Sequence, residues 1–368
     1  RFFTEPLSHR PGPGLEARRV PRGVVAAVTP WNNPLAIPLG KLAPAIVYGN
    51  TVIWKPAPQG AAIAQTVIEL LEGADTPTEA VQLVQGGVTA GRALMATAGV
   101  DAVTLTGSPG AGIAAQLACA PRMIPLQAEL GGNNAAIVWR DARLPEATDA
   151  IARGAFGFAG QRCTATRRLI VPTDRLDSLV ERLLAVAAAL PLGDPLDPHT
   201  VIGPVIDDEN QQRIERTIAR AEADGAQVRR VRPGRDTFEV LTARGSYVAP
   251  AIIICDDPTL EVVQHETFGP VLVVQPARDW DHAMTLCNGV TQGLAASLFT
   301  QDDALWRSFT EAAQAGILKR NQSTAGASAA LPFAGCKASA LGPPEHANGD
   351  RAFYTRAVAV YLGHQASQ

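Results

Sequence analysis

The feature that most constrains this chain is an alternation of short apolar runs with longer helix-like stretches. The apolar runs are rich in β-branched residues and lie at 23–28, 51–54, 81–84 and 102–106. Helical patterns separate them, notably at 60–72 and 109–118. Strands that are apolar on both faces and alternate with helices form parallel sheets that are covered on each side. We therefore predict a doubly wound α/β unit, which binds ligands beyond the carboxyl ends of its strands.

A second series of the same kind follows Gly131-Gly132, which we expect to act as a hinge. Its strands are expected at 135–139, 167–171, 247–254 and 271–275, and its helices at 144–159, 175–189 and 208–224. Residues 1–22 are expected to form an extended arm with turns, and the charged residues 229–244 an irregular surface connection. An apolar strand at 357–362 ends the pattern, and we expect it to pair with another sheet, such as that of a neighbouring subunit.

Composition excludes several classes of protein. Hydrophobic residues make up 46% of the 368 positions, so the chain can bury a large core, and its length suits about two domains. The 32 basic and 35 acidic residues give a net charge of −3, which argues against nucleic-acid binding. No apolar run approaches the roughly 18 residues that span a bilayer. Five widely spaced cysteines without a C-x-x-C pair indicate neither a zinc motif nor a disulfide framework, so we expect a cytoplasmic protein.

Cys163, in the sequence Gly160-Gln-Arg-Cys163, is the candidate nucleophile. Most cysteines are buried as small apolar residues, and from this residue alone that interpretation stays open. A preceding glycine, glutamine and arginine suit a core poorly, however, and an adjacent cation favours the thiolate. A thiolate that attacks a carbonyl needs donors for the developing oxyanion and, for hydrolysis, a base that activates water.

Groups of the required kinds follow the predicted strands of the first unit. Glu129 ends the strand-like residues 124–130, and the two glycines after Leu130 leave room for another group, so Glu129 is a candidate general base. Asn32, at the turn after the first strand, offers a side-chain amide to an oxyanion, and Lys55 follows the second strand towards the ligand crevice. The plain alternatives are an exposed carboxylate, a turn asparagine and a solvated lysine.

A glycine-rich turn, Thr106-Gly-Ser-Pro-Gly-Ala-Gly112, leads from a predicted strand into a helix. Its backbone N–H groups suit a phosphate, but it matches neither G-x-G-x-x-G nor a P-loop, so a packing turn is equally open. His265, which precedes Glu266, is interpreted as a polar turn residue. The sequence contains no H-x-x-x-H or other metal-ligand spacing, and we expect no metal.

These pieces occur together in the order that is typical of one family. They are Pro30-Trp-Asn-Asn-Pro34, Gly49-Asn-Thr-Val-Ile-Trp-Lys-Pro56, Thr106-Gly-Ser108, Glu129-Leu-Gly-Gly-Asn133, Gly160-Gln-Arg-Cys163 and Glu266-Thr-Phe-Gly-Pro270. From about Pro21 to its C-terminal strand the chain resembles the NAD(P)-dependent aldehyde dehydrogenase superfamily. Within it, Gly160-Gln-Arg-Cys-Thr164 and Pro332-Phe-Ala-Gly335 are most similar to the succinylglutamate-semialdehyde dehydrogenases.

The resemblance implies a role for each residue. Cys163 would form a thiohemiacetal with the aldehyde, Asn32 and the Cys163 backbone N–H would stabilise the oxyanion, and Glu129 would activate the water that hydrolyses the thioester to a carboxylate. The implied substrate is an aldehyde, such as the acidic succinylglutamate semialdehyde. NAD is the expected cofactor, with NADP left open because Pro58 stands where an acidic residue often binds the adenine ribose. The implied cofactor-binding residues are Lys55, Gly107, Ser108, Gly112, Glu266, Phe268, Thr29, Pro30, Trp31 and Leu130.

The implied architecture is an aldehyde dehydrogenase-like α/β fold. It comprises a Rossmann-type NAD(P)-binding domain at 22–130, an α/β catalytic domain at 131–331, a C-terminal segment at 332–368, and a small oligomerisation arm that joins 1–21 to 352–365. A homodimer or homotetramer is expected. The N-terminal portion that the family usually carries before residue 23 is absent from this chain, which would leave apolar surface uncovered.

Two alternatives to a hydrolytic aldehyde dehydrogenase stay open at this point. A CoA-acylating enzyme is disfavoured by Glu129, because a water-activating base would hydrolyse the intermediate. A catalytically inactive interaction protein or fragment is suggested by the short N-terminus and disfavoured by the intact set Cys163, Glu129 and Asn32. Arg320 and Ser323 fall in the segment that the family uses to line the substrate mouth, where a cation suits an acidic aldehyde, although Arg320 is equally consistent with a surface residue.

Overall fold

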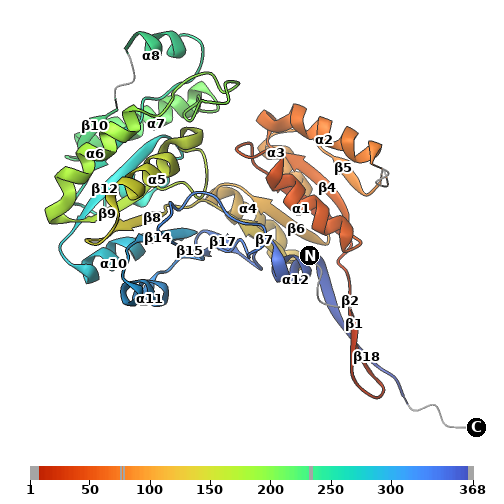
Figure 1. Ribbon diagram of the computed structural model, residues 1–368. Coiled ribbons are helices and arrows are strands. Elements are labelled where there is room, and N and C mark those ends of the chain that lie inside the picture. The colour runs from red at the N-terminus through yellow and green to blue at the C-terminus, as the bar shows by residue number, and fades with distance from the viewer. Residues whose placement is uncertain (1–7, 75–76, 78, 232–234, 364–368) are drawn as a thin grey trace, which may run out of the picture. The chain divides into compact units, whose positions relative to one another are not determined.

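A computed structural model describes residues 8–74, 77, 79–231 and 235–363, which fold into two compact units (Figure 1). Unit 1 comprises Arg1–Leu130, Ser328–Ala334 and Ala340–Gln368. Unit 2 comprises Gly131–Ala327 and Gly335–Ser339. No helix within the described ranges is long and apolar enough to cross a bilayer.

Unit 1 is built on a parallel sheet that one short antiparallel strand extends. Its order in the described chain is β17-β7-β6-β3-β4-β5. The strands are β3 Val24–Thr29, β4 Thr51–Pro56, β5 Val81–Leu83, β6 Ala102–Thr106, β7 Leu126–Glu129 and β17 Ala340–Leu341. Helices α1 Ala36–Val47, α2 Ala61–Gly73, α3 Val88–Ala96, α4 Pro109–Cys119 and α12 Ala347–Tyr354 connect or follow them. The alternation of β-branched strands with helices therefore produces the predicted doubly wound arrangement.

Alternate residues of each strand in unit 1 pack on opposite layers of helices. Val25 and Ala27 face a cluster with α1, α2 and α12, in which Trp54 is fully buried. Ala26 and Val103 face a second cluster with α3 and α4. Because side chains along a strand point alternately to the two faces, a wholly apolar strand buries both of its sides.

An arm of antiparallel strands also belongs to unit 1. β1 Ser8–Gly12 pairs with β2 Leu15–Pro21, and β2 pairs along its length with β18 Thr355–Tyr361. The expected arm, which joins residues 1–21 to 352–365, is present at residues 8–21 as two antiparallel strands that pair with the C-terminal strand. Residues 1–7 lie outside the described range. The terminal strand does pair with another sheet, as predicted, and that sheet is in its own chain.

Unit 2 contains a larger sheet of the same type, with the order β10-β11-β12-β9-β8-β14-β15 in the described residues. Only the edge strand β10 runs antiparallel among these. The strands are β8 Ala135–Val138, β9 Arg168–Pro172, β10 Gln227–Arg230, β11 Ala251–Ile254, β12 Val271–Ala277, β14 Ala295–Phe299 and β15 Ile317–Arg320. A small ladder joins β13 Gln292–Gly293 to β16 Cys336–Lys337.

Helices cover both faces of this sheet. They are α5 Leu144–Phe156, α6 Leu176–Ala188, α7 Asp208–Ala223, α8 Arg235–Thr242, α9 Glu261–Gln264, α10 Trp280–Asn288 and α11 Asp303–Ala312. One layer consists of α5 and α6, whose apolar residues pack on Ala136, Leu169 and Leu272. The other layer includes α7 and α10, which pack on the side of Ile253 and Ile170.

Two predicted elements of unit 2 were wrong. The charged residues 229–244 are not an irregular connection, since β10 ends at Arg230 and α8 occupies Arg235–Thr242. The predicted strand 247–254 is shorter, because only Ala251–Ile254 joins the sheet. Tyr247 instead donates its hydroxyl to the Gly193 carbonyl at 3.0 Å, which holds that part of the chain against a loop.

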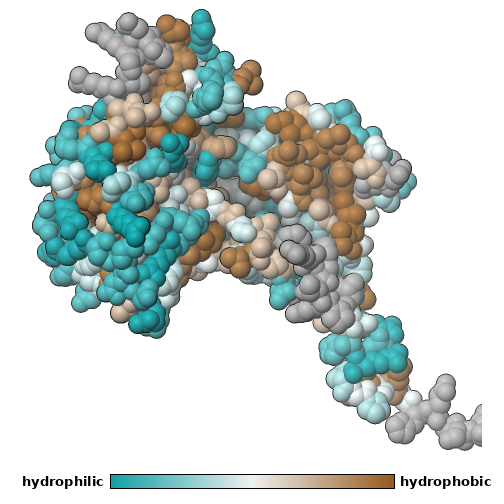
Figure 2. Space-filling view, in the orientation of Figure 1, coloured by the Kyte–Doolittle hydropathy of each residue, from teal (hydrophilic) through white to brown (hydrophobic). Residues whose placement is uncertain are grey.

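Apolar side chains gather on the surface of unit 1 over α1 and α2 (Figure 2). The exposed large apolar residues on and beside these helices are Leu35, Leu39, Val47, Ile63 and Leu70. Exposed apolar residues scattered singly are ordinary, whereas these residues lie on and beside neighbouring helices of the same unit.

The turn after β17 packs closely on β7, and a substitution there tests how much this contact stabilises the edge of the unit 1 sheet. Gly342 has φ +87°, and a Cβ at this position would overlap the carbonyl oxygen of Leu126 in β7. We expect Gly342→Ala to lower the free energy of unfolding by at least about 1–3 kcal/mol, because the left-handed backbone and the close carbonyl both disfavour a side chain. Gly99→Ala is the control, since a Cβ there meets no atom within 4 Å. Equal urea midpoints for the two variants would contradict the expectation.

Candidate functional site

The carboxyl ends of four neighbouring strands of unit 1 carry the predicted polar residues. β3 ends at Thr29, β4 with Lys55 and Pro56, β6 at Thr106 and β7 at Glu129. The register pairs Thr29 with Pro56 and Thr106 with Glu129, so these residues line one edge of the sheet. This is the edge at which parallel α/β sheets bind ligands.

Asn32 lies in the loop between β3 and α1, half-buried like its neighbours Pro30 and Trp31. The start of this loop is fixed by Thr29, whose buried hydroxyl accepts a hydrogen bond from Trp54 Nε1 at 2.9 Å. Asn33 Oδ1 accepts the N–H of Ala36 at 3.3 Å at the start of α1. The two asparagines therefore differ in their contacts. Asn33 binds the start of α1, and Asn32 precedes it in the loop.

Lys55 is a buried cation at the end of β4. The residue is 5% exposed, and its ammonium makes no hydrogen bond or ion pair to any part of the chain that the structure describes. Burial lowers the pKa of this amine. Gly91 of α3 lies beside the Lys55 stem, since a Cβ at this glycine would be in ordinary van der Waals contact with Lys55 Cδ at 3.5 Å. A buried ammonium without a partner is costly, so a ligand that offers oxygen atoms would stabilise it.

The glycine-rich turn after β6 forms the N-terminus of α4. Ser108 is the N-cap, and its side chain accepts the N–H of Ala111 at 3.3 Å. Gly107 donates its N–H to the carbonyl of Glu129 at 3.0 Å. A Cβ at Gly112 would lie 2.6 Å from Leu130 Cδ1, so this glycine lets the helix pack closely on the residue that follows β7.

Glu129 is the most strongly perturbed acid at this edge. It is 2% exposed, and its Oε2 atom has no hydrogen-bond partner among the described residues. Burial raises the pKa of Glu129 to about 9, and the nearby Glu345 carboxylate adds to the increase. The plain interpretation of an exposed carboxylate is therefore wrong. A carboxylate with a raised pKa is a stronger base, and it therefore removes a proton from water more readily.

A buried polar cluster lies behind Glu129 in the same unit. Lys41 of α1 donates to Glu345 and, at 2.9 Å, to the Thr104 hydroxyl. Thr106 donates its hydroxyl to Glu345 at 3.2 Å. Lys41 partly offsets the increase in the pKa of Glu129. Because a buried ion pair needs further hydrogen bonds to offset its desolvation, this cluster fixes the packing of α1 and the segment before α12 on the sheet.

These residues fit a dinucleotide. The N-terminus of α4 offers backbone N–H groups and a positive dipole end to a pyrophosphate. The unpartnered Lys55 ammonium offers a donor to ribose hydroxyls. Gly112 allows a close approach of the helix to the strand, which is the role of a glycine in dinucleotide-binding turns.

In unit 2, Cys163 lies in the loop between α5 and β9, with its thiol half-buried. The loop is held by Asn134, whose Nδ2 donates to the Cys163 carbonyl at 2.7 Å and to the Ala165 carbonyl at 2.8 Å. A Cβ at Gly132 would lie 2.5 Å from that same Cys163 carbonyl oxygen. Gly132 of the glycine pair therefore provides clearance for the Cys163 backbone.

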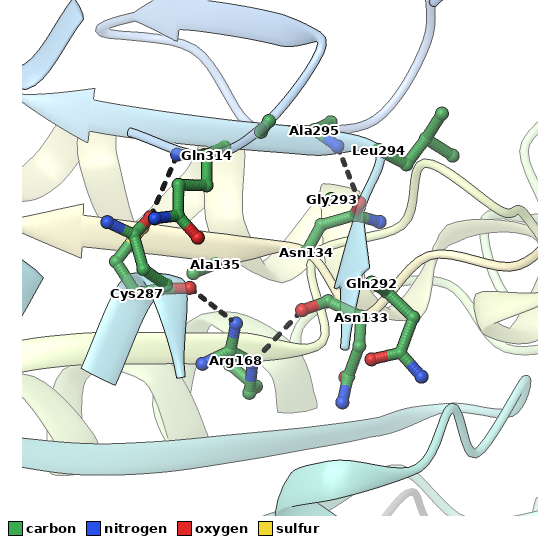
Figure 3. A pocket seen from close by; sticks show the side chains of 13 residues that line it. Asn133, Asn134, Ala135, Arg168, Cys287, Gln292, Gly293, Leu294, Ala295 and Gln314 are labelled. Carbon is green, nitrogen blue, oxygen red and sulfur yellow. Dashed lines mark hydrogen bonds between the residues drawn. The ribbon is translucent and has the colours of Figure 1, made fainter. Parts of the chain in front are cut away.

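The segment that carries Asn134 is itself fixed on both sides. Asn134 Oδ1 accepts the N–H of Ala295 at 2.9 Å, and Arg168 donates to the Asn133 carbonyl at 3.0 Å and to the Cys287 carbonyl at 3.0 Å (Figure 3). The cavity that these residues line measures only about 10 Å³. That volume suits one water molecule and no organic ligand, so these contacts are structural.

Arg167 joins the Cys163 loop to the loop that carries Glu266 and Phe268. This fully buried guanidinium donates to the carbonyls of Gly160, Arg162 and Gly269, the last at 2.8 Å. It lies 3.8 Å from the Glu266 carboxylate and 5.6 Å from the centroid of the Phe268 ring. The pKa of Glu266 is raised to about 7 by burial, which outweighs the effect of Arg167.

Sequence analysis did not identify Asn134 or Arg167 as parts of the site, and it gave Gly132 as room for another group rather than as clearance for the Cys163 carbonyl. The Asn-Asn pair after Gly132 and the Arg-Arg pair after Cys163 were the available signals, since polar residues beside predicted buried strands need partners. Arg320 was interpreted as a candidate for the substrate mouth, and the structure pairs it with Asp303 at 2.5 Å. Among the described residues no group of three His, Cys, Asp or Glu side chains could hold a metal.

The position of Arg167 predicts its effect on the thiol. We expect Arg167→Met to slow alkylation of Cys163 by iodoacetamide several-fold, because a nearby cation that favours the thiolate is lost. The pH at which alkylation is half-maximal should rise for the same reason. Arg167→Lys keeps the charge and should retain more of the rate. Arg140→Met is the control, because Arg140 pairs with Asp174 on the surface of the same unit. An unchanged pH profile for Arg167→Met would contradict the role.

Comparison with known proteins gives the same assignment throughout the chain. The model of the aldehyde dehydrogenase family matches residues 5–360. The chain is 35% identical to the alpha-ketoglutaric semialdehyde dehydrogenase of Bacillus subtilis, over 94% of this chain and 70% of that protein. It is 39% identical to N-succinylglutamate 5-semialdehyde dehydrogenase 1 of Caulobacter vibrioides, over 86% of this chain and 66% of that protein.

A solved structure agrees with these relatives. The Mycobacterium tuberculosis aldehyde dehydrogenase complexed with NAD+ matches 98% of this chain and 74% of its own, with a TM-score of 0.91 and 30% identity. The chain thus spans about two thirds to three quarters of the length of the proteins it matches. The predicted α/β fold is confirmed, and the chain belongs to the aldehyde dehydrogenase family.

Proposed function

We propose that this chain is an NAD(P)-dependent aldehyde dehydrogenase that oxidises an aldehyde to a carboxylate through a cysteine thioester. The observation that carries the proposal is the Cys163 loop, whose backbone is fixed by the buried Asn134 and Arg167. Buried polar side chains that hold one loop around a half-buried thiol position a nucleophile rather than fill a core. The sequence relatives named above are all dehydrogenases of semialdehydes, which supports the same activity.

In the proposed reaction the Cys163 thiolate adds to the aldehyde carbon. The Asn32 side-chain amide and the Cys163 backbone N–H donate hydrogen bonds to the oxyanion that forms. The dinucleotide, when bound, supplies a hydride acceptor. Glu129 then takes a proton from water, and the resulting hydroxide attacks the acyl thioester and releases the carboxylate and the thiol. A CoA-acylating enzyme would not need this base, so Glu129 favours hydrolysis.

The residues of unit 1 would hold the dinucleotide, as would Glu266 and Phe268 of unit 2. Gly107, Ser108 and Gly112 would bind the pyrophosphate, and Lys55 the ribose, with Thr29, Pro30, Trp31 and Leu130 beside it. NAD is favoured because a solved relative is complexed with NAD+, and NADP stays open because Pro58 offers no carboxylate against a 2′-phosphate.

The proposed substrate is an acidic semialdehyde. The printed names of two relatives specify alpha-ketoglutaric semialdehyde and N-succinylglutamate 5-semialdehyde, both of which carry a carboxylate. An inactive interaction protein remains the second candidate, favoured by the apolar surface over α1 and α2. Reduction of NAD by the purified chain, and its loss in Cys163→Ala, would separate the two candidates.

The domain assignments and the assembly are part of the same proposal. Residues 22–130 would bind the cofactor, 131–331 would carry the nucleophile, and 332–368 would complete both units. A homodimer or homotetramer would form through the arm of β1, β2 and β18, because β18 is an edge strand of its sheet and an exposed edge pairs readily with another strand. The cytoplasm is the proposed location, since none of the five cysteines forms a disulfide.

Replacing the base should separate the two halves of the reaction. We expect Glu129→Gln to produce a single burst of NADH and then little steady turnover, because hydride transfer precedes hydrolysis of the thioester. Stopped-flow absorbance at the NADH band, with an aldehyde in excess, measures both phases. Cys163→Ala should abolish the burst as well. Loss of the burst in Glu129→Gln would contradict the role given to Glu129.

The raised pKa of Glu129 also predicts the pH dependence of hydrolysis. The carboxylate is the active form of the base, so the rate of thioester hydrolysis should rise about tenfold per pH unit and level off near pH 9. Single-turnover decay of the acyl-enzyme measures this step alone. In Glu129→Gln the plateau near pH 9 should disappear. A rate that is flat from pH 6 to pH 9 in the unmodified chain would overturn the assignment.

A further inference from the structure

The surface segment 321–326 of unit 2 has one buried residue, Thr324. Thr324 is 0% exposed, whereas the other residues of this segment are exposed or half-buried. A threonine that a surface segment buries brings a hydroxyl that must find hydrogen-bond partners. The partners that the structure gives this hydroxyl are Thr164 and Thr166, which are one and three residues after Cys163.

The directions of these two hydrogen bonds follow from the single proton of a hydroxyl. Thr324 Oγ1 lies 2.8 Å from the Thr164 carbonyl oxygen, which can only accept, so the Thr324 hydroxyl is the donor there. Thr324 Oγ1 also lies 3.0 Å from Thr166 Oγ1. Because the Thr324 proton is already used, Thr166 donates in this second bond. Thr166 therefore holds the Thr324 hydroxyl in the direction of the Thr164 carbonyl.

A glycine of α5 lets the two segments meet closely. A Cβ at Gly154 would lie 2.6 Å from Ser323 Cβ and 2.9 Å from Thr166 Oγ1. A glycine inside a helix is unfavourable relative to alanine, so this position is occupied for clearance rather than for helix stability. The Gly326 N–H adds a second bond between the segments, since it donates to Thr164 Oγ1 at 3.0 Å.

The Thr164 carbonyl is the start of a chain of hydrogen bonds that leads to the backbone of the nucleophile. A carbonyl and the N–H of the next residue belong to one planar peptide group and point in opposite directions. The peptide group that joins Thr164 to Ala165 accepts the Thr324 hydroxyl at its carbonyl end. At its other end the Ala165 N–H donates to the Arg162 carbonyl at 3.1 Å. The Arg162 carbonyl belongs in turn to the peptide group that contains the Cys163 N–H.

The neighbouring carbonyls of this segment are held by Asn134. Its Nδ2 donates to the carbonyls of Cys163 and Ala165, at 2.7 and 2.8 Å. Thr324 supplies the donor for the Thr164 carbonyl that lies between them. Three successive carbonyls from the nucleophile onwards are thus bound by buried side chains, and the middle one depends on a residue 160 positions away.

We propose that Thr324 is a positioning residue that directs the Cys163 backbone N–H towards the oxyanion formed from the aldehyde. Its hydroxyl acts through two peptide groups, and hydrogen bonds in such a chain also polarise one another. A donor stabilises an oxyanion well only when its N–H points at the place where the charge develops. This inference rests on the proposed aldehyde oxidation and adds a buried residue that acts through the main chain.

The test compares two reactions of the same thiol, of which only one forms an oxyanion. When the Cys163 thiolate adds to an aldehyde, a sulfur–carbon bond forms and the carbonyl electron pair moves to oxygen. When it reacts with iodoacetamide, a sulfur–carbon bond forms and iodide leaves, so no oxyanion develops. An effect on the Cys163 N–H should therefore slow the first reaction and not the second.

Thr324→Val keeps the size of the side chain and removes the hydroxyl. With NAD and 4-oxobutanoate, we expect the rate constant of the first NADH formation to fall about 10- to 100-fold, because complete loss of one oxyanion donor costs about 10²- to 10³-fold. The aldehyde concentration that gives half of the maximal rate constant should change less than about threefold. The rate of Cys163 alkylation, measured without aldehyde, should change less than about twofold.

Three further variants isolate the hydroxyl. Thr324→Ser keeps the donor and should retain most of the rate constant, whereas Thr324→Ala lacks it and should be as slow as Thr324→Val. The serine and alanine variants differ by one oxygen atom, so they carry the comparison if Thr324→Val does not fold. Thr148→Val is the matched control, because the buried Thr148 hydroxyl also donates to a main-chain carbonyl at 2.8 Å, that of Leu144 in its own helix. It should leave both reactions unchanged.

Three outcomes would overturn the inference while leaving the proposed oxidation intact. The first is NADH formation as fast in Thr324→Val as in the unmodified chain. The second is an equal loss in NADH formation and alkylation, which would make Thr324 a support of the thiol itself. The third is a serine variant as slow as the alanine variant. Absence of any Cys163-dependent NADH from the unmodified chain would instead count against the proposed function.

Hydrogen exchange tests the same chain of bonds without turnover. In Thr324→Val the amide deuterium uptake of residues 162–168 should be faster than in the unmodified chain, since the hydrogen-bonded N–H groups of Ala165 and Thr166 lie there. Thr148→Val should leave this uptake unchanged. Equal uptake at 162–168 in Thr324→Val and the unmodified chain would overturn the inference, whatever the chain does with aldehydes.

Discussion

The position of the Cys163 loop in unit 2 depends on the hydrogen bonds from Asn134 to the carbonyls of Cys163 and Ala165. They tie the loop before β9 to the residues that begin β8, two strands that pair directly in the sheet. Because Asn134 is buried, each unmade bond would leave a polar group without water, which costs about 1–3 kcal/mol. The glycine at 132 is required by the same contact, since any side chain there would meet the carbonyl oxygen of Cys163.

The charged groups at the edge of the unit 1 sheet follow a different principle. Lys55 and Glu129 are both nearly inaccessible, and their pKa values move in opposite directions, each towards the neutral form. A structural ion pair would shift both towards the charged form. The ionisable groups at this edge of the sheet are therefore buried without a full set of hydrogen-bond partners. The strands that carry them are held in place by the helices packed on both faces of the sheet. Groups held in this state gain stability from a ligand that supplies the missing partners.

Most of the fold could be predicted because its strands are apolar on both faces and its turns follow them at regular intervals. The strands ending at Thr29, Thr106 and Glu129, and with them the candidate residues of unit 1, follow from that pattern. The arm at 8–21 was expected only from the resemblance to the family, because its two strands carry little apolar alternation and its Arg-rich sequence resembles a loop. Arg167 was missed for another reason, since one of its acceptors, Gly269, is about a hundred positions away. A single sequence shows a buried polar residue but not its partner.

The strained loop before Cys163 shows how these two principles combine. Left-handed conformations at Phe158 and Ala159 are unfavourable. Gln161 donates to the Phe158 carbonyl, and Arg167 and Asn134 bind the carbonyls of Gly160 and Cys163 that follow. All three residues bind main-chain groups, and Arg167 also lies 3.8 Å from the Glu266 carboxylate. The left-handed residues and the buried polar side chains therefore act on one segment, the main chain that leads to Cys163. Backbone strain concentrates at functional sites, which agrees with the role proposed for this cysteine.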